Sequence, residues 1–145
     1  MAGERTEDRG VARPELRRTV ETPEGSFEVE EASGTAFAEI ARRKGDYAVC
    51  GAGVVVTLDE DRRVTTVRAS YVSVGLTPEV HDLTDAVIGS PVDKADWAAA
   101  GELARTLVDP DTDIHASADY RRLLVGVLTE RTLRDAAAEA AERAA

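Results

Sequence analysis

The chain is poor in aromatic residues, cysteine and positive charge. The first shortage constrains its core, and the other two exclude kinds of partner and site. Phe, Trp and Tyr make up 4% of the 145 residues, so the core must be built from Val, Leu, Ile and Ala. Eighteen Lys and Arg against 28 Asp and Glu give a formal net charge of -10, which argues against nucleic acid or an acidic membrane surface as a partner. The single cysteine, Cys50, excludes an internal disulfide, and with only two histidines the sequence predicts no metal site.

Segments for membrane insertion or export are also lacking. The chain has no run of about eighteen apolar residues and no basic start followed by a hydrophobic stretch. We therefore expect a cytoplasmic protein without a membrane partner. The length suits one domain, which we place at residues 34–145. Residues 1–33 are expected to form a charged, partly disordered N-terminal arm, because residues 1–18 mix charges with Gly and Pro and show no apolar period.

The clearest secondary-structure signal is a two-residue alternation over residues 47–58. One face of this strand carries only apolar residues: Ala48, Cys50, Ala52, Val54, Val56 and Leu58. A polar turn follows at residues 59–62, and residues 64–74, which are rich in Val, Thr, Tyr and Ser, predict a returning antiparallel strand. A shorter alternation at residues 26–30 predicts a strand or an edge ribbon.

A short helix is expected before this hairpin. Thr35 is a candidate N-cap, and the spacing of Phe37, Ile40 and Ala41 puts these three residues on one helical face. Gly45 then supplies the residue that most readily adopts the left-handed conformation at a helix end.

Three more helices are expected after the hairpin. The first covers residues 82–88, and the second begins at Asp93 and runs to residue 108. The third begins at Ser117, with Asp113 as a competing earlier cap, and its end at residues 135–145 is expected to fray. The apolar face of this last helix would consist of Leu123, Leu124, Val127, Leu128 and Leu133.

Two arginines follow the start of the last helix. We assign Arg121 and Arg122 a structural role, in which their side chains snorkel from the helix flank and pair with Asp119 or Glu130.

The order of the elements, strands first and helices later, predicts an α+β fold. We expect an antiparallel sheet of three to four strands covered on one face by about three helices. The run Gly51-Ala52-Gly53 does not indicate a dinucleotide-binding fold, because Val56 replaces the third glycine of that fingerprint and the segment continues as a strand. Small residues on a strand face more often admit a neighbouring backbone or a flat ring.

Two separated motifs carry a resemblance to a known family. Residues 113–133 read DIHASADYRRLLVGVLTERTL, and residues 37–48 read FAEIARRKGDYA. In this order they resemble the C-terminal domain of the FAD-binding medium subunit of molybdenum hydroxylases, the carbon monoxide dehydrogenase and xanthine dehydrogenase family. The resemblance covers roughly residues 34–141 and implies the same α+β architecture. Because no Gly-Gly-Thr type loop is present, we expect the family's N-terminal flavin domain to be missing.

The resemblance also implies where a flavin would lie. In the family, the Gly-Asp-aromatic segment lies where the C-terminal domain approaches the isoalloxazine ring, so Asp46 and Tyr47 are the implied flavin-edge residues. A structural role remains open, in which Asp46 caps a turn and Tyr47 packs at a strand edge. The chain alone is expected to bind no cofactor, and FAD is expected only in a complex.

Two functions remain open, and whether the isolated chain is an enzyme is left undecided. The first is an accessory or split subunit of an oxidoreductase that docks on an FAD-binding or molybdopterin subunit and completes a flavin pocket; it predicts an exposed apolar patch near the start of the hairpin. The second is a freestanding, repurposed domain, acting as a cofactor-free cyclase or isomerase with Tyr71 and His81 as pocket contacts. A homo-oligomer is a further candidate partner state.

Overall fold

The computed structural model describes residues 17–22, 25–30, 32–41, 43, 48–75 and 79–144. The chain forms strands β1 (Arg17–Thr22), β2 (Gly25–Glu30), β3 (Ser33–Ala41), β4 (Ala48–Leu58), β5 (Val64–Val72) and β6 (Val80–Asp82). Three helical elements follow: the 3-10 helix η2 (Thr84–Ala86) and the α-helices α1 (Trp97–Leu107) and α2 (Ala118–Ala144).

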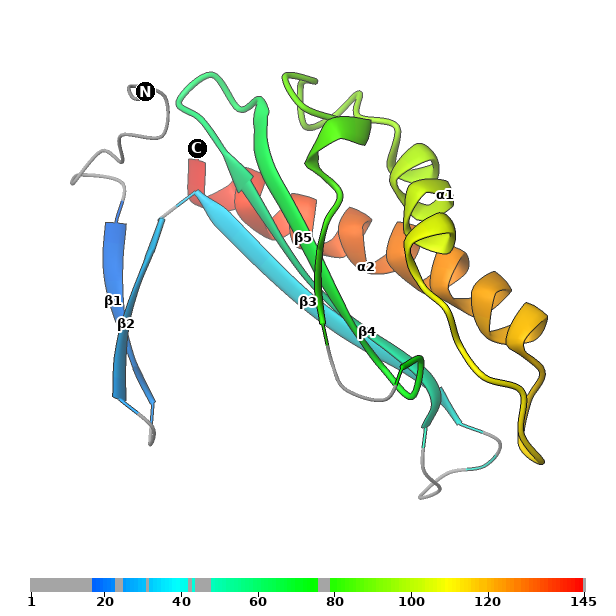
Figure 1. Cartoon of the computed structure of the whole chain (residues 1–145). Coiled ribbons are helices and arrows are strands. Elements are labelled where there is room, and N and C mark those ends of the chain that lie inside the picture. The colour runs from blue at the N-terminus through cyan, green and yellow to red at the C-terminus, as the bar shows by residue number, and fades with distance from the viewer. Residues whose placement is uncertain are drawn as a thin grey trace, which may run out of the picture.

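The main sheet is covered by helices on a single face (Figure 1). Strands β3, β4, β5 and β6 make an antiparallel sheet in that order, and β1 pairs with β2 in a separate two-stranded sheet. Helix α2 packs against β3 and β4, and α1 packs on α2. This arrangement confirms the predicted α+β class, the four-stranded antiparallel sheet and its helical cover on one face.

The β4–β5 hairpin follows the predicted alternation closely. From Cys50 onwards, the apolar face of β4 is buried under the helices, and β5 places Tyr71 on the same face. The turn is held by Asp59, whose Oδ1 accepts hydrogen bonds from the backbone N–H groups of Asp61 and Arg63 at 2.9 Å each. Arg62 completes the turn with a φ of 62°, in the left-handed region.

The predicted helix at residues 35–41 is wrong, because this segment is part of β3. Its side chains alternate across the sheet: Thr35, Phe37 and Glu39 are exposed, whereas Ala36 and Ala38 lie half-buried towards α2. The apolar spacing fits a helix as well as a strand, and Ala favours a helix locally. Pairing along most of β4 overrides that local preference, since the ladder satisfies the backbone groups of nearly the whole segment.

Two further boundaries differ from the sequence predictions. Helix α1 begins at Trp97 rather than near Asp93, because the Asp96 carboxylate caps it by accepting from the backbone N–H of Ala99 at 3.0 Å. The expected helix at residues 82–88 is only the single turn η2, and Gly89, with a φ of 78°, terminates the segment as predicted.

Helix α2 begins as predicted but does not fray at its end within the described residues. Ser117 Oγ accepts from the backbone N–H of Tyr120 at 3.0 Å, which confirms the cap. The predicted fraying of residues 135–145 is wrong, because Ala136 and Ala140 are fully buried over Gly34 of β3. The buried face also differs from the predicted one: Leu124, Leu128 and Leu133 are buried, whereas Leu123 and Val127 are exposed.

The predicted N-terminal arm contains β1 and β2, at residues 17–22 and 25–30. Residues 1–16 lie outside the described residues. The domain boundary between residues 33 and 34 stays a prediction, although β3 already begins at Ser33.

Candidate functional site

The residues implied as the flavin edge cannot be placed. Gly45, Asp46 and Tyr47 lie outside the described residues, and the description resumes at Ala48, the first residue of β4. Their role therefore stays a prediction. Tyr71 and His81, the other two candidates, lie together at this end of the sheet, where Ala52 of β4 pairs with Tyr71 of β5 and Ala69 of β5 pairs with His81 of β6.

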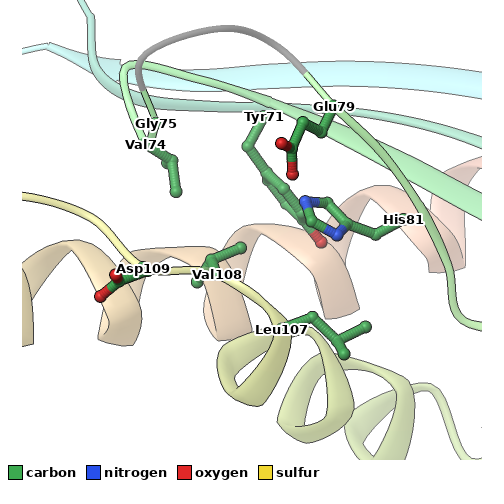
Figure 2. A pocket seen from close by; sticks show the side chains of 8 residues that line it. All are labelled: Tyr71, Val74, Gly75, Glu79, His81, Leu107, Val108 and Asp109. Atoms are coloured by element: carbon green, nitrogen blue, oxygen red, sulfur yellow. The ribbon is translucent and has the colours of Figure 1, made fainter.

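Tyr71 and His81 line one pocket, which we call the Tyr71–His81 pocket (Figure 2). Its volume is about 330 Å³, and it opens between the end of the sheet and the C-terminal end of α1. The two rings form one wall, with their centroids 5.8 Å apart and their planes inclined at 38°. The remaining lining residues are Val74, Gly75, Glu79, Leu107, Val108 and Asp109.

The Tyr71 side chain serves as a fixed wall of this pocket and not as a proton acceptor. Its hydroxyl shares a 2.6 Å hydrogen bond with Thr129 Oγ1 of α2, and its ring is buried. Burial, which disfavours the charged phenolate, raises the pKa of Tyr71 to about 12 although the Thr129 hydrogen bond opposes the change. The group is therefore neutral and already hydrogen-bonded near neutral pH.

The charges at the pocket are of one sign. Glu79 and Asp109 line it, and none of its eight lining residues is a lysine or an arginine. Asp109 is exposed and pairs with Arg122 Nη2 at 3.3 Å, whereas the Glu79 carboxylate points towards the Tyr71 and His81 rings in Figure 2. Such a pocket repels anions.

A second functional feature is the sheet face that the helices leave uncovered, which we call the open face. It is formed by neighbouring residues of β3 to β6, and Phe37 is its largest side chain, 60% exposed. The exposed apolar residues on it are Phe37, Val55, Val72 and Val80. Because Phe37 and Val72 flank the first half of β4, the predicted exposed apolar patch near the start of the hairpin is confirmed.

The glycines of β4 are explained by this face. A Cβ on Gly51 would lie 3.3 Å from Cζ of Phe37, and one on Gly53 would lie 3.5 Å from Cδ1 of the same ring. Phe37 therefore lies flat across the two glycines, as an aromatic residue often does over a strand glycine. The flat ring that the sequence allowed for is supplied by the chain itself.

Arg121 forms a buried network that the sequence analysis missed. Its guanidinium donates to the backbone carbonyls of Val49 at 3.3 Å, Asp111 at 2.9 Å and Ala116 at 3.1 Å, and to both carboxylate oxygens of Asp113 at 3.2 Å. The predicted snorkelling is therefore wrong for Arg121, whose side chain is 6% exposed. The signal available in the sequence was Asp113, which stands eight residues before Arg121. The loop before α2 folds back over the first turn of the helix and brings the Asp113 carboxylate to the guanidinium.

Arg122, the next residue, does behave as predicted. It remains at the helix flank and pairs with Asp119 at 3.4 Å, and it also reaches Asp109. Asp113 itself is exposed, and its pKa is lowered mainly by the hydrogen bond from the backbone N–H of His115.

The described residues do not fit a complete FAD. The Gly51-Ala52-Gly53 run stays within a strand and lies under Phe37, so it cannot cradle a pyrophosphate at a helix start. The Tyr71–His81 pocket presents carboxylates, which oppose a diphosphate.

The four-stranded antiparallel sheet with helices on one face defines an α+β domain, and comparison with known proteins gives its family. The chain belongs to the CO dehydrogenase flavoprotein C-terminal domain family, whose model matches residues 35–136. It is 38% identical over 102 residues to 6-hydroxypseudooxynicotine dehydrogenase complex subunit alpha of Paenarthrobacter nicotinovorans, a match that covers 70% of this chain and 34% of that protein. It is 37% identical over 105 residues to caffeine dehydrogenase subunit beta of Pseudomonas sp. strain CBB1, covering 72% and 35%.

Solved structures show the same fold. Quinoline 2-oxidoreductase from Pseudomonas putida 86 superposes with a TM-score of 0.63 at 25% identity, over 86% of this chain and 53% of that chain. Reconstituted CO dehydrogenase from Oligotropha carboxidovorans gives a TM-score of 0.63 at 23% identity, over 85% and 53%. The chain thus spans about a third of the length of the curated relatives it matches.

Among the residues that the structure describes, no helix combines the length and the apolar character that a bilayer crossing requires. Within the same part of the chain, no three His, Cys, Asp or Glu side chains lie together as metal ligands.

Proposed function

We propose that this chain is an accessory or split component of a molybdenum hydroxylase, which docks on a separate FAD-binding subunit and completes its flavin pocket. The observation that carries the proposal is the open face. Four large apolar side chains, Phe37, Val55, Val72 and Val80, are exposed on this one face, and exposed apolar surface of this kind often marks an interaction site. Family membership gives the kind of partner, since the relatives are subunits of dehydrogenase complexes by name.

The site would work by positioning and not by chemistry of its own. In the proposed complex, Asp46 and Tyr47 would lie at the ring edge, next to the start of β4, and the open face would exclude water beside them. FAD, when bound by the partner, supplies the two-electron transfer. The chain's residues would orient the ring and shield it, and a molybdopterin subunit would complete the complex in the cytoplasm.

Binding measurements on the purified chain test this proposal. The partner is the FAD-binding subunit encoded in the same genome, purified with its FAD, and association is followed by size-exclusion chromatography and by the change in flavin fluorescence. We expect the chain alone to elute without flavin absorbance and to form a flavin-containing complex with the partner. Absence of any association at micromolar concentrations would contradict the proposal.

Phe37→Ser tests the surface itself. Losing the burial of one large apolar side chain costs about 1.5–3 kcal/mol, which weakens the complex about ten-fold or more. The matched control is Ile88→Ser, because Ile88 is 61% exposed, almost the same as Phe37, but lies outside the open face. If both substitutions weaken the complex equally, the open face is not the docking surface.

The repurposed cyclase or isomerase remains the second candidate, favoured by the Tyr71–His81 pocket. The pocket is open and carries carboxylates, and Tyr71 is already hydrogen-bonded to Thr129, so His81 is the lining group best placed to move a proton. Gene neighbourhood separates the two proposals. Molybdopterin and iron–sulfur subunit genes beside this one support the accessory role, and a biosynthetic cluster supports the catalyst.

A further inference from the structure

We propose that the Tyr71–His81 pocket is a binding site for a small organic cation that carries one flat apolar ring. This site goes beyond the docking function, because its lining comes from the end of the sheet and the end of α1 and includes none of the exposed apolar residues of the open face.

The pocket has the size and the walls of a site for one ring. Its volume of about 330 Å³ is at the small end of the range for ligand pockets, about 300–1,000 Å³. Val74, Leu107 and Val108 give apolar surface, and the Tyr71 and His81 rings, inclined at 38° to each other, give an aromatic wall (Figure 2). Because the Tyr71 hydroxyl is fixed by Thr129, the Tyr71 part of this wall is held in place before a ligand arrives.

The charges select the sign of the ligand. Asp109 is paired with Arg122, whereas Glu79 is a pocket carboxylate to which no salt bridge is formed among the described residues. A cation placed against the aromatic wall gains from the ring quadrupole, for which a distance of about 6 Å from the ring centroid is sufficient. The carboxylate and the rings therefore attract the same kind of group, and the net charge of -10 adds to this preference.

Three small probes of the same shape test the proposal on the full chain. Benzylammonium, benzyl alcohol and benzoate share one ring and differ in charge, and binding is followed by backbone amide chemical shifts in two-dimensional NMR at neutral pH. We expect saturable shifts at Gly75, Glu79, His81 and Val108 with benzylammonium, weaker shifts with benzyl alcohol and the weakest with benzoate. Equal binding of all three, or preference for benzoate, overturns the proposal, and so does the absence of saturable shifts at millimolar benzylammonium.

Two substitutions at exposed positions confirm where the probe binds. Glu79→Gln removes the charge and keeps the shape, so it should weaken benzylammonium about three- to five-fold and leave benzyl alcohol unchanged. Leu107→Lys places a cation at the pocket and should abolish benzylammonium binding. The control is Asp93→Asn, an exposed acid at the opposite end of the sheet near the bridge between Arg63 and Pro91, which should change nothing. An equal loss in Asp93→Asn would mean that only the net charge matters, and the proposed site would be wrong.

Discussion

Gly34→Ala tests the closest contact between the sheet and α2. A Cβ on Gly34 would overlap the carbonyl oxygen of Ala136 and would lie 2.6 Å from the backbone nitrogen of Ala140 and 2.9 Å from the carbonyl carbon of Ala136. These are backbone atoms of the helix, so no side chain can rotate to make room. The whole end of α2 would have to move away from β3.

The magnitude follows from two opposed terms. Overpacking of this kind costs about 1–3 kcal/mol, and the upper end applies because the obstacle is backbone. Alanine recovers about 0.4–1 kcal/mol by restricting the unfolded chain, since Gly34 does not have a positive φ. The net loss is about 2 kcal/mol in the free energy of unfolding, or roughly 8 °C in Tm for a domain of this size.

Urea unfolding measures this loss directly. The chain has one tryptophan, Trp97, which is 4% exposed, so its fluorescence reports unfolding of the core. Gly53→Ala is the control, because its Cβ would make an ordinary 3.5 Å contact with Phe37. If the free energy of unfolding of Gly34→Ala lies within about 0.5 kcal/mol of that of the natural chain, the end of α2 is not packed on β3 and frays as its sequence suggests.

Two more predictions concern buried polar groups. Arg121→Met should lower the free energy of unfolding by about 3 kcal/mol in the same urea experiment, because it removes the guanidinium that donates to the carbonyls of Val49 and Asp111 and to the Asp113 carboxylate. Arg122→Met breaks only exposed pairs and should cost under about 1 kcal/mol. Equal losses would contradict the network. Burial raises the pKa of Cys50 from 9.0 to about 11 and that of Tyr71 from 10.0 to about 12, so the folded chain holds these protons more tightly than the unfolded one. These groups should therefore leave the stability unaffected below about pH 9, and the stability should fall between about pH 9 and 12. In thermal melts, Cys50→Ala should reduce the slope of Tm against pH between pH 9 and 11. If Cys50→Ala leaves that slope unchanged, this assignment is contradicted.

The hairpin was predictable because its sequence signal and its packing have the same period. Alternate residues of β4 face the helices and the open face, so a two-residue pattern is all that the structure needs. The last helix was predictable at its start for a similar reason, since the Ser117 cap acts on amides only a few residues away. Both features depend on neighbours in the sequence.

The errors occur where distant segments decide the structure. Residues 35–41 have a helical spacing of apolar residues, but pairing with β4 makes them a strand. The tail of α2 is rich in Ala and Glu, which suggests fraying. It is nevertheless held on β3 by the close approach at Gly34 and by a 2.8 Å hydrogen bond from the backbone N–H of Thr35 to Glu139. Small residues carry little hydrophobic signal, yet they permit the closest approach. The open face was predicted from the family resemblance, whereas the Phe37 ring over the two glycines needed the β3–β4 register.

The Arg121 network connects the sequence motif at residues 113–133 with the start of β4. The guanidinium joins the loop that begins at Asp113 to the carbonyl of Val49, which lies two residues after Tyr47. The same buried guanidinium donates to carbonyls of the loop and to the Val49 carbonyl of β4. A displacement of the loop that moves Arg121 would therefore also cost the hydrogen bond at the start of β4. The motif that identifies the domain thus acts at a distance of many residues, by holding the start of β4, the strand that follows the proposed flavin-edge residues in the sequence.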